Sequence, residues 1–408
     1  MNSPRLSVAF VVLHTSPLDE PGTKDAGGMN VVVRAQAAEL ARLGHEVQLI
    51  TRRTSPQQAA EVTLEPRLTV FHLDAGPAQV LAKGEHEPLI APFGDALRAH
   101  LAAHPADLVH AEHWYSGLAA LPVARELGVP LVQSFHSIAA AAGTPLADGE
   151  RAEAPGRLAG EQQLARDADL VVVVSRSEAQ TVATRLGGDP ARVRVVEPGV
   201  DTELFRPCAG AECAERAAWL ASGGRPEVVV AGRLDPLKRF DLAIAAIAAI
   251  EPERRPALRI VGAPPPSGDE YARSLHEAVA AAGMLSTTSF DGALRRSELA
   301  ERIRRSSLVL IPSHSETFGL VALEAAASGV PVIASATGGL LEAVVDGETG
   351  LLIASDNPHE WAAAIERVLT DDALASRLGR AARVHALAHG WAGSAAKLLA
   401  AYREVLSA

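Results

Sequence analysis

The sequence is poor in cysteine, in aromatic residues and in long apolar runs, and it lacks an excess of positive charge. Its 408 residues include two cysteines and 4% aromatic residues, and its net charge is −11. Two cysteines cannot form the dense disulfide framework of a small secreted domain. Strong negative charge argues against a surface that binds nucleic acid or an anionic membrane. No apolar run approaches the about 20 residues that a membrane-spanning helix needs.

Both cysteines lie in a polar connecting stretch, Thr202–Gly224, which we expect to be irregular. Cys208 and Cys213 are close enough in sequence to pair, but two reduced thiols in a cytoplasmic protein are the preferred interpretation. Near the N-terminus, Arg5 lies close to the apolar segment Val8–Leu13, which has no small-residue cleavage site after it. We therefore expect a first strand rather than a signal peptide, and a cytoplasmic location.

Short β-branched runs alternate with helical patterns along the whole chain, as in a parallel sheet with helices on both faces. The first set lies at Val8–Leu13, Glu46–Thr51, Leu68–Leu73, Leu108–Ala111, Leu131–Phe135, Leu170–Val174 and Val193–Val196. The second set lies at Glu227–Ala231, Leu258–Val261, Thr288–Phe290, Leu308–Ile311, Val330–Ala334 and Gly350–Ile353. Two doubly wound α/β domains are predicted.

The break at Pro198-Gly199-Val200 separates the two sets of strands. We predict an N-terminal Rossmann-like domain over residues 1–200 and a C-terminal Rossmann-like domain over residues 201–385. An amphipathic stretch, Trp391–Leu406, lies in a final segment, 386–408, which we expect to pack back on the N-terminal domain. Because ligands bind beyond the carboxyl ends of parallel strands, the two domains are expected to face a shared cleft.

Two cations follow the first strand of the second domain. Arg233 and Lys238 lie in the loop Gly232-Arg233-Leu234-Asp235-Pro236-Leu237-Lys238-Arg239, which opens a helix. A guanidinium and an ammonium in one loop can converge on a diphosphate. The alternative is a solvated basic loop, but in an acidic protein a cation pair at a strand's carboxyl end favours an anion site.

The most specific stretch is Ser313-His314-Ser315-Glu316-Thr317-Phe318-Gly319-Leu320-Val321-Ala322-Leu323-Glu324, after the strand Leu308–Ile311. A helix is expected to begin around Phe318, and its free N–H groups can bind sugar hydroxyls or a phosphate. Glu316 and Glu324 add carboxylates that accept hydrogen bonds from hydroxyls. Together these groups describe a polyol-binding slot, and the alternative is a capping glutamate with a surface glutamate.

A third candidate is the glycine pair Gly27-Gly28, which follows the first strand and opens a helix expected near Asn30–Leu43, ending at Gly44. Glycines there leave backbone N–H groups open to an anionic group. The alternative is ordinary turn chemistry.

Glu316-x-Phe318-Gly319-x-x-x-x-Glu324, together with Gly232-Arg233-x-x-x-x-Lys238, resembles the signature of glycosyltransferase family 4 (GT4), a family of retaining enzymes with the GT-B fold. Further matching segments run in the same order along the chain: Gly27-Gly28-Met29-Asn30-Val31, Gly128-Val129-Pro130-Leu131-Val132, Gly160-Glu161-Gln162-Gln163, Pro198-Gly199-Val200-Asp201 and Thr337-Gly338-Gly339-Leu340. Over nearly its full length the chain is similar to the D-inositol-3-phosphate glycosyltransferases of mycothiol biosynthesis.

The resemblance implies a nucleotide-diphosphate sugar as co-substrate, with no cofactor and no metal. It implies that the domain over residues 1–200 binds the acceptor and that the domain over residues 201–385 binds the nucleotide sugar. Arg233 and Lys238 would bind the diphosphate and stabilise charge on the leaving nucleotide. Glu324 would bind the ribose and Glu316 the donor sugar. The remaining implied donor-binding residues are Gly27, Gly28, Leu294, Thr317, Phe318, Gly319 and Leu320. The motif Asp167-Ala168-Asp169 is expected to end a helix rather than bind a metal.

The resemblance also implies front-face attack with retention of configuration, and His136 matches the active-site histidine. The implied acceptor-binding residues are Asn30, Lys83, His113, Ser137 and Arg157. His113 stands where the relatives have a tyrosine and Ser137 where they have a threonine, and the Lys-Asn pair of the relatives is missing after Ser137. The acceptor is therefore expected to be small and polar: inositol phosphate, or a thiol or aminocyclitol in antibiotic or other natural-product assembly.

The motifs fit a glycosyltransferase better than two other classes of protein. A GT-B epimerase needs acid–base carboxylates at the donor sugar, and a phosphorylase normally holds pyridoxal phosphate. Neither arrangement replaces the signature of Glu316 and Glu324 in this sequence. A non-catalytic sugar-nucleotide-binding protein would be expected to lack Glu316, Lys238 or His136, and all three are present. Neither UDP nor GDP is favoured by the sequence, and the family suggests a homodimer.

Overall fold

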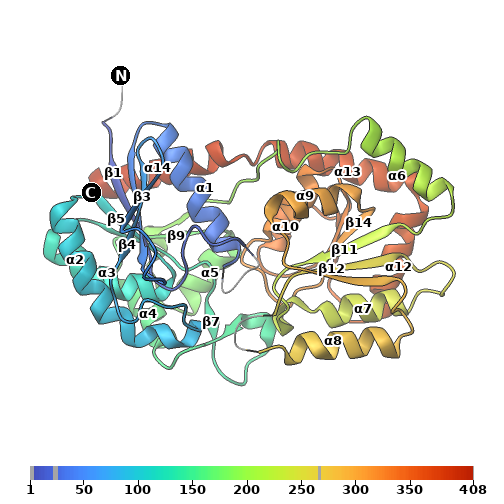
Figure 1. Cartoon of the computed structure of the whole chain (residues 1–408), viewed down its shortest axis with the longest axis horizontal. Coiled ribbons are helices and arrows are strands. Elements are labelled where there is room, and N and C mark those ends of the chain that lie inside the picture. Colours follow the sequence, from blue (N-terminus) through green and yellow to red (C-terminus); the bar gives the residue numbers. More distant parts are fainter. Residues whose placement is uncertain (1–3, 22–25, 265–267, 408) are drawn as a thin grey trace. The chain divides into compact units, whose positions relative to one another are not determined.

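The computed structural model describes residues 4–21, 26–264 and 268–407. The chain divides into two compact units, each with its own sheet (Figure 1). Unit 1 comprises Met1–Asp19, Asp25–Pro198 and Trp391–Ala408, and unit 2 comprises Glu20–Lys24 and Gly199–Gly390. Both sheets carry helices, and their strands pair in parallel except at one edge of the first sheet, which confirms the predicted α/β class with two Rossmann-like sheets.

The sheet of unit 1 has the strand order β10-β9-β6-β5-β1-β2-β4-β3. Its strands are β1 (Ser7–Val12), β2 (Glu46–Arg52), β3 (Glu61–Glu65), β4 (Leu68–Leu73), β5 (Leu108–Glu112), β6 (Leu131–Ser134), β9 (Leu170–Val173) and β10 (Val193–Val195). Seven of them match the predicted runs. The edge strand β3 was missed, because its sequence EVTLE carries too little apolar surface, and it pairs antiparallel with β4.

The helices of unit 1 are α1 (Gly28–Arg42), α2 (Ile90–Ala103), α3 (His113–Leu127), α4 (Arg157–Asp167), α5 (Arg176–Thr184) and α14 (Trp391–Ser407). Short 3₁₀ turns lie at η1 (Lys83–Leu89), η2 (Leu146–Asp148) and η3 (Pro190–Arg192), and a small ribbon pairs β7 (Ala139–Ala140) with β8 (Glu150–Arg151). Successive side chains of β1 point to opposite faces of the sheet, so this strand contributes to two separate hydrophobic cores. Ala9 and Val11 pack with α2, α3, α4 and α5, whereas Val8 and Phe10 pack with α1 and α14.

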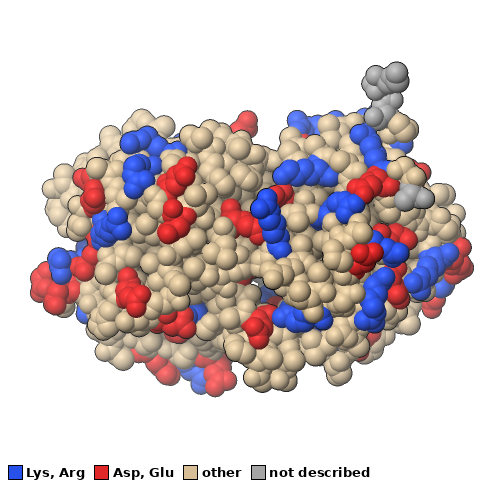
Figure 2. Space-filling view, turned by 180° about the vertical axis from the view of Figure 1, so that it is seen from behind, with Lys and Arg blue, Asp and Glu red and all other residues tan. Residues whose placement is uncertain are grey.

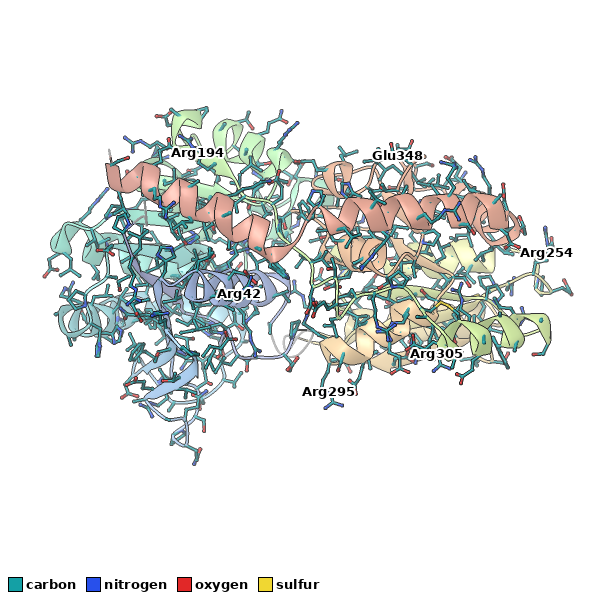
Figure 3. The ribbon with its side chains drawn as sticks, turned by 90° about the horizontal axis from the view of Figure 1, so that it is seen from above. Arg42, Arg194, Arg254, Arg295, Arg305 and Glu348 are labelled. Atoms are coloured by element: carbon teal, nitrogen blue, oxygen red, sulfur yellow. A yellow bond between two sulfur atoms is a disulfide. The ribbon has the colours of Figure 1, made fainter. Side chains whose placement is uncertain are left out.

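The final helix, α14, belongs to unit 1 although it follows unit 2 in the chain. Leu398 and Tyr402 are fully buried against the sheet, and the Tyr402 hydroxyl is 2.6 Å from Nδ1 of His110 on β5. Gln36 on α1 donates a hydrogen bond to Ser394 at 3.0 Å. Figure 3 shows α14 lying beside α1, with the labelled Arg194 on the side of α14 that faces away from α1, where it pairs with Glu404.

The sheet of unit 2 has the order β13-β12-β11-β14-β15-β16, and all its pairs are parallel. Its strands are β11 (Glu227–Ala231), β12 (Ala257–Val261), β13 (Thr288–Gly292), β14 (Leu308–Ile311), β15 (Val332–Ser335) and β16 (Leu351–Ile353). Its helices are α6 (Ala211–Ala221), η4 (Pro236–Lys238), α7 (Phe240–Ala248), α8 (Glu270–Ala281), α9 (Arg296–Arg305), α10 (Leu320–Ala327), α11 (Leu340–Ala343), α12 (Pro358–Thr370) and α13 (Asp372–Leu387).

The stretch from residue 202 to 224 contradicts two predictions. It is not irregular, because the alanine-rich segment Ala211–Ala221 forms α6, in keeping with the high helix propensity of alanine. The two cysteines are not reduced: Cys208 and Cys213 form a disulfide at the start of this helix. Helix α6 buries none of its residues, so the bond ties an exposed helix to the segment before it.

Charged side chains of both signs are interspersed over the face shown in Figure 2 rather than gathered into one patch. Within residues 4–21, 26–264 and 268–407, no helix is long and apolar enough to cross a membrane.

Candidate functional site

In unit 2 the strand order reverses between β11 and β14, which are neighbours in the sheet. The loops that follow these two strands therefore begin side by side, at the position where ligands bind in parallel sheets. The first loop carries Arg233 and Lys238, and the second comprises residues 312–319. A main-chain hydrogen bond joins them, because the His314 N–H donates to the Leu237 carbonyl at 2.8 Å.

The central contact of this site is an ion pair between the two loops. Nζ of Lys238 lies 2.6 Å from Oε1 of Glu316, and the Ser313 hydroxyl donates to the same oxygen at 2.9 Å. The Lys238 and Glu316 side chains are 27% and 14% exposed, so the pair is accessible from solvent. Arg233 lies in the same loop as Lys238, 3.7 Å from the Asp235 carboxylate. Two side chains predicted from separate motifs are thus in direct contact.

Glu324 lies in α10 and is almost fully buried. Burial raises the pKa of its carboxyl group, and the guanidinium of Arg296 acts in the opposite direction from 2.8 Å away. The Arg296 guanidinium also lies 5.0 Å from the centre of the Phe205 ring. The carboxylate expected to bind ribose hydroxyls therefore has a cationic partner that the motif did not predict.

Glycines hold the backbone of the second loop in place. Gly319 precedes α10 with a φ of 102°, which a residue with a side chain rarely adopts. A Cβ on Gly338 would lie 2.2 Å from the Glu316 carbonyl, and the Gly339 N–H donates to that carbonyl at 2.8 Å.

Helix α10 begins two residues later than expected around Phe318. Of the other predicted donor residues, Phe318 is buried, and Leu294, Thr317 and Leu320 are half-buried.

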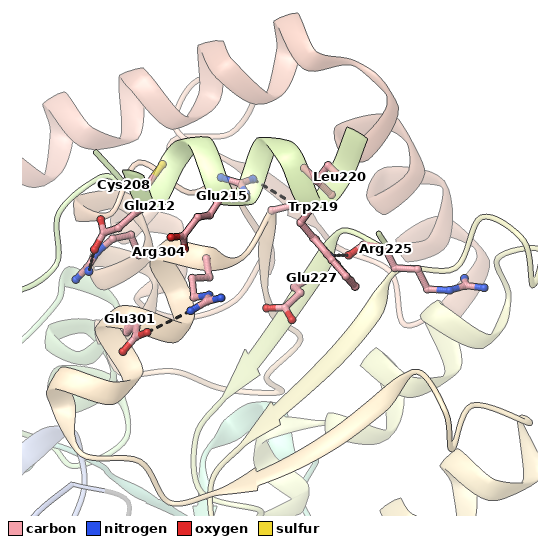
Figure 4. Close-up of a pocket in the computed structure, with 12 residues that line it drawn as sticks. Cys208, Glu212, Glu215, Trp219, Leu220, Arg225, Glu227, Glu301 and Arg304 are labelled. Atoms are coloured by element: carbon pink, nitrogen blue, oxygen red, sulfur yellow. Dashed lines mark hydrogen bonds and ion pairs between the residues drawn. The ribbon is translucent and has the colours of Figure 1, made fainter. Parts of the chain in front are cut away.

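A cavity of about 320 Å³ lies elsewhere in unit 2, against the disulfide-bonded helix α6 (Figure 4). Its walls include Trp219 on α6, Glu227 at the start of β11 and Ser307 just before β14. These positions mark the amino ends of the strands, opposite the end that carries the two loops. None of the predicted donor-binding residues lines it.

In unit 1 the strand order reverses at β1, which lies between β2 and β5. His14 follows β1, His113 begins α3 directly after β5, and His136 follows β6. The rings of His14 and His113 lie with their centres 4.3 Å apart. His113 and His136 have φ angles of 70° and 59°, which are costly for residues with a side chain and commonly mark functional sites.

His136 is bound to a carboxylate. Its Nε2 atom forms a hydrogen bond with Oε2 of Glu112, the last residue of β5. Burial lowers the pKa of His136, but the charge and hydrogen bond of Glu112 outweigh it, so the pKa is raised. Burial raises the pKa of Glu112, but His110 and His136 outweigh it, so that pKa is lowered. Both effects favour an imidazolium–carboxylate pair.

The glycine pair lies at the start of α1, which begins two residues before the predicted Asn30. Gly28 is exposed, whereas Asn30 is only 3% exposed. The Asn30 amide donates to the Ser16 carbonyl at 2.7 Å and to the Thr15 hydroxyl at 3.1 Å, and its oxygen accepts from the Gly27 N–H at 3.1 Å. In this structure Asn30 therefore fixes the loop after β1 to the start of α1.

Three predicted acceptor-binding residues converge on one oxygen of Glu150. Oε1 of this residue accepts hydrogen bonds from Nζ of Lys83 at 2.9 Å, from the Ser137 hydroxyl at 2.7 Å and from Arg157 at 2.7 Å. The side chains of Lys83 and Glu150 are 19% and 16% exposed, and that of Arg157 is fully buried. The structure thus brings Lys83, Ser137 and Arg157 together around an anion supplied by the chain.

Arg157 is also bound to two other carboxylates. Its Nε donates to Glu161 at 2.7 Å, and its Nη1 donates to Glu153 as well as to Glu150. Its Nη2 donates to the carbonyl and the hydroxyl of Ser137 at 3.1 and 3.0 Å. Burial lowers the pKa of Arg157, but the three carboxylates outweigh it and raise the pKa above its ordinary value.

His113, the fifth predicted acceptor residue, is 2% exposed, and neither of its ring nitrogens has a hydrogen-bond partner among the described residues. Its Nε2 is 3.9 Å from Oε1 of Glu153. Burial lowers the pKa of His113, and the nearby His14 and Lys83 lower it further, which favours the neutral ring. Burial likewise lowers the pKa of His14.

The residues of these sites that the sequence did not predict include His14, Glu112, Glu150 and Arg296. His14 follows β1 and Glu112 ends β5, so their position at the carboxyl ends of strands is a signal that the sequence does carry. Glu150 and Arg296 reach partners at Lys83 and Glu324 through tertiary contacts, and no local pattern marks them.

Comparisons with known proteins cover nearly the whole chain. Residues 26–204 match the family described as Glycosyltransferase Family 4, and residues 213–385 match the family described as Glycosyl transferases group 1. The D-inositol 3-phosphate glycosyltransferase of Kribbella flavida is 41% identical, over 99% of this chain and 96% of its own. That of Frankia alni is 40% identical, over 97% of this chain and 98% of its own.

The solved structures that resemble the chain share its two-sheet architecture. Sucrose-phosphate synthase from Thermosynechococcus elongatus has a TM-score of 0.88 and 29% identity, covering 99% of this chain and 100% of its own. Anabaena HepE, solved in complex with UDP and glucose, has a TM-score of 0.75 and 21% identity with 99% and 100% coverage, and shows a similarity of fold alone.

Proposed function

Because the chain belongs to glycosyltransferase family 4, we propose that it transfers a sugar, with retention of anomeric configuration, from a nucleotide diphosphate to 1D-myo-inositol 3-phosphate. That it is a glycosyltransferase of the GT-B type follows from its family and relatives. The nucleotide-sugar co-substrate follows from the same family. The retaining course, the acceptor and the residue roles are the proposal.

The observation that carries the donor assignment is the contact of Lys238 with Glu316 where the strand order of unit 2 reverses. In the proposal, Lys238 and Arg233 neutralise the donor diphosphate, and Glu316 accepts hydrogen bonds from a sugar hydroxyl. The N–H groups at the start of α10 and the two cations carry the charge of the leaving group, so the proposal requires no metal ion. Glu324 binds the ribose through its second oxygen.

The proposed reaction is a direct exchange of one bond for another on one face of the sugar. An acceptor hydroxyl oxygen bonds to the anomeric carbon, while the bond from that carbon to the diphosphate oxygen breaks. The hydroxyl proton passes to the departing diphosphate oxygen, and the bonding electrons of the broken bond leave with the diphosphate. Arg233 and Lys238 stabilise the charge that develops there. His136, oriented by Glu112, binds a hydroxyl of the donor sugar.

Two observations favour an acceptor that carries a phosphate. The relatives reported above are named for inositol 3-phosphate. In unit 1, Lys83, Ser137 and Arg157 already converge on one anionic oxygen. His113 replaces the tyrosine expected in the relatives, and its unpartnered ring nitrogens suit a hydroxyl of the cyclitol. The choice of UDP or GDP, a cytoplasmic location and a homodimer stay predictions.

The test is a transfer assay with the purified chain. UDP- and GDP-sugars are offered in turn with inositol 3-phosphate, unphosphorylated myo-inositol and a small thiol, and products are identified by mass and by the NMR coupling of the anomeric proton. We expect transfer to inositol 3-phosphate with the anomeric configuration of the donor. An inverted product would refute the retaining course, and transfer to the thiol alone would refute the acceptor.

A further inference from the structure

Helix α10 carries one ionisable side chain in an otherwise apolar sequence. Its residues are LVALEAAA, and all positions from Ala322 to Ala327 are buried. Glu324 is the charged residue among them, and it is 3% exposed. A buried carboxylate is costly unless a cation and hydrogen bonds compensate it. The place of Glu324 on this helix therefore calls for a group that balances its charge.

Arg296 is that group. Its Nη1 atom lies 2.8 Å from Oε1 of Glu324, and no other ion pair involves Glu324 among residues 4–21, 26–264 and 268–407. The Arg296 guanidinium also lies 5.0 Å from the centre of the fully buried Phe205 ring, within the range of a cation–π contact. The Arg296 side chain is 24% exposed. A carboxylate and an aromatic ring thus fix the guanidinium in place.

The local sequence gives no reason for a cation at this position. Arg296 is the first residue of α9. A positive charge in the first turn of a helix opposes the macrodipole, whereas the acidic Glu298 in the same turn suits it. A neutral residue at position 296 would therefore serve the helix better. The tertiary contacts with Glu324 and Phe205 account for the arginine.

The ion pair sets both the direction and the charge of the carboxylate. Arg296 binds Oε1, so rotation of the carboxylate group is restricted and Oε2 is held in one direction. Burial raises the pKa of the Glu324 carboxyl group, and the charge and hydrogen bond of Arg296 oppose this rise. Arg296 therefore favours the ionised form, which accepts hydrogen bonds from hydroxyl groups and donates none.

We propose that Arg296 is a positioning residue of the donor's ribose site: it orients Glu324 so that the site distinguishes a ribonucleoside diphosphate from a deoxyribonucleoside diphosphate. The inference rests on the proposed function, because that function assigns the ribose to Glu324. Arg296 acts through the carboxylate and does not itself touch the donor. An oriented carboxylate gains a hydrogen bond only from a ligand that has the hydroxyl, and a deoxyribose leaves the carboxylate unpaired.

The test compares Arg296→Met with Arg304→Met. Both arginines lie on α9 and form ion pairs, and Arg304, whose side chain is 12% exposed, lies 3.0 Å from Glu212. Arg304 lines the cavity at the amino ends of the strands, opposite the two donor loops. Methionine keeps much of the apolar stem of either side chain. The control therefore removes an ion pair of the same helix without touching Glu324.

Calorimetry gives the dissociation constants of UDP and GDP, of their 2′-deoxy and 3′-deoxy forms, and of pyrophosphate. For the base that binds more tightly, we expect wild type to bind the ribonucleotide at least about tenfold more tightly than one of its deoxy forms, because a hydrogen bond to a charged group is lost. In Arg296→Met this ratio should fall below about threefold, whereas Arg304→Met should keep it. Affinity for pyrophosphate, which has no ribose, should stay unchanged in both variants.

A double variant shows whether Arg296 acts through the carboxylate. Adding Arg296→Met to Glu324→Gln should leave the ratio of Glu324→Gln unchanged, because the carboxylate through which Arg296 acts is already gone. Circular dichroism checks that each variant is folded. If Arg296→Met is not, Arg296→Lys replaces it, and its ratio should lie between wild type and Glu324→Gln, because lysine keeps the charge but not the planar guanidinium.

A wild-type ratio in Arg296→Met would overturn the inference and leave the proposed transfer reaction standing. A further fall of the ratio in the double variant would also overturn it, because Arg296 would then contact the nucleotide directly. Equal binding of ribose and deoxyribose forms by wild type would refute both the inference and the ribose role of Glu324. The expected ratios, with no transfer to inositol 3-phosphate by wild type, would uphold the inference and refute the proposed acceptor.

Discussion

The replacement Lys238→Ala tests the donor site most directly. Lys238 is the cation of the inter-loop pair, 2.6 Å from Glu316 and 27% exposed. At an effective dielectric constant of about 20, a unit charge about 4 Å from developing negative charge is worth about 4 kcal/mol. Partial exposure reduces this value. We therefore expect a loss of about 3 kcal/mol of transition-state stabilisation, comparable to the loss of one oxyanion donor and equal to about a hundredfold in kcat/KM.

The assay is steady-state transfer at saturating acceptor, with the nucleotide released from the donor sugar quantified. Most of the loss should appear in kcat, because the charge that Lys238 stabilises grows as the diphosphate departs. The matched control is Arg254→Ala, which removes a cation of unit 2 that is 62% exposed and pairs with Glu366. It should retain wild-type kcat/KM. A Lys238→Ala enzyme with wild-type turnover would refute the reasoning.

Three further predictions concern stability and the shape of the site. Tyr402→Phe should lower the free energy of unfolding by about 1–2 kcal/mol in urea titrations, because it leaves a buried histidine nitrogen without its partner; an unchanged transition would contradict this. In the folded protein the pKa of His136 is raised and the pKa of Glu112 is lowered, so their pairing stabilises the fold most between the ordinary pKa values of 4.5 and 6.5. This stabilisation is lost as the pH rises through the folded pKa of His136, and it is lost as the pH falls through the folded pKa of Glu112. Glu112→Gln should therefore lose more stability relative to wild type near pH 5.5 than near pH 9, as thermal melts at about these two values would show. Gly338→Ala should weaken donor binding more than Gly347→Ala, because both glycines have positive φ but only the first has backbone 2.2 Å from the added Cβ; equal donor affinities, measured by calorimetry, would argue against this role.

The alternation of apolar runs along the sequence by itself determined most of the fold. Each β-branched run forms a strand of the expected sheet, because a strand covered by helices on both faces must be apolar throughout. The sequence also placed Arg233, Lys238 and Glu316 correctly at strand ends, since that property depends only on where a strand stops. Strand β3 and helix α6 were not predicted, because their residues are too exposed to give the apolar pattern of a buried element.

The tertiary structure alone decided which charges meet. Lys238 and Glu316 are 78 positions apart, and Lys83 and Glu150 are 67 apart. Such contacts follow from the order of strands in the sheet and from the course of the loops, neither of which has a local signature. The sequence therefore determined which residues stand at the ligand-binding ends of the strands. Only the fold showed that Arg157 is satisfied by carboxylates and that Arg296 partners Glu324, because these pairings depend on distances between segments that local patterns do not encode.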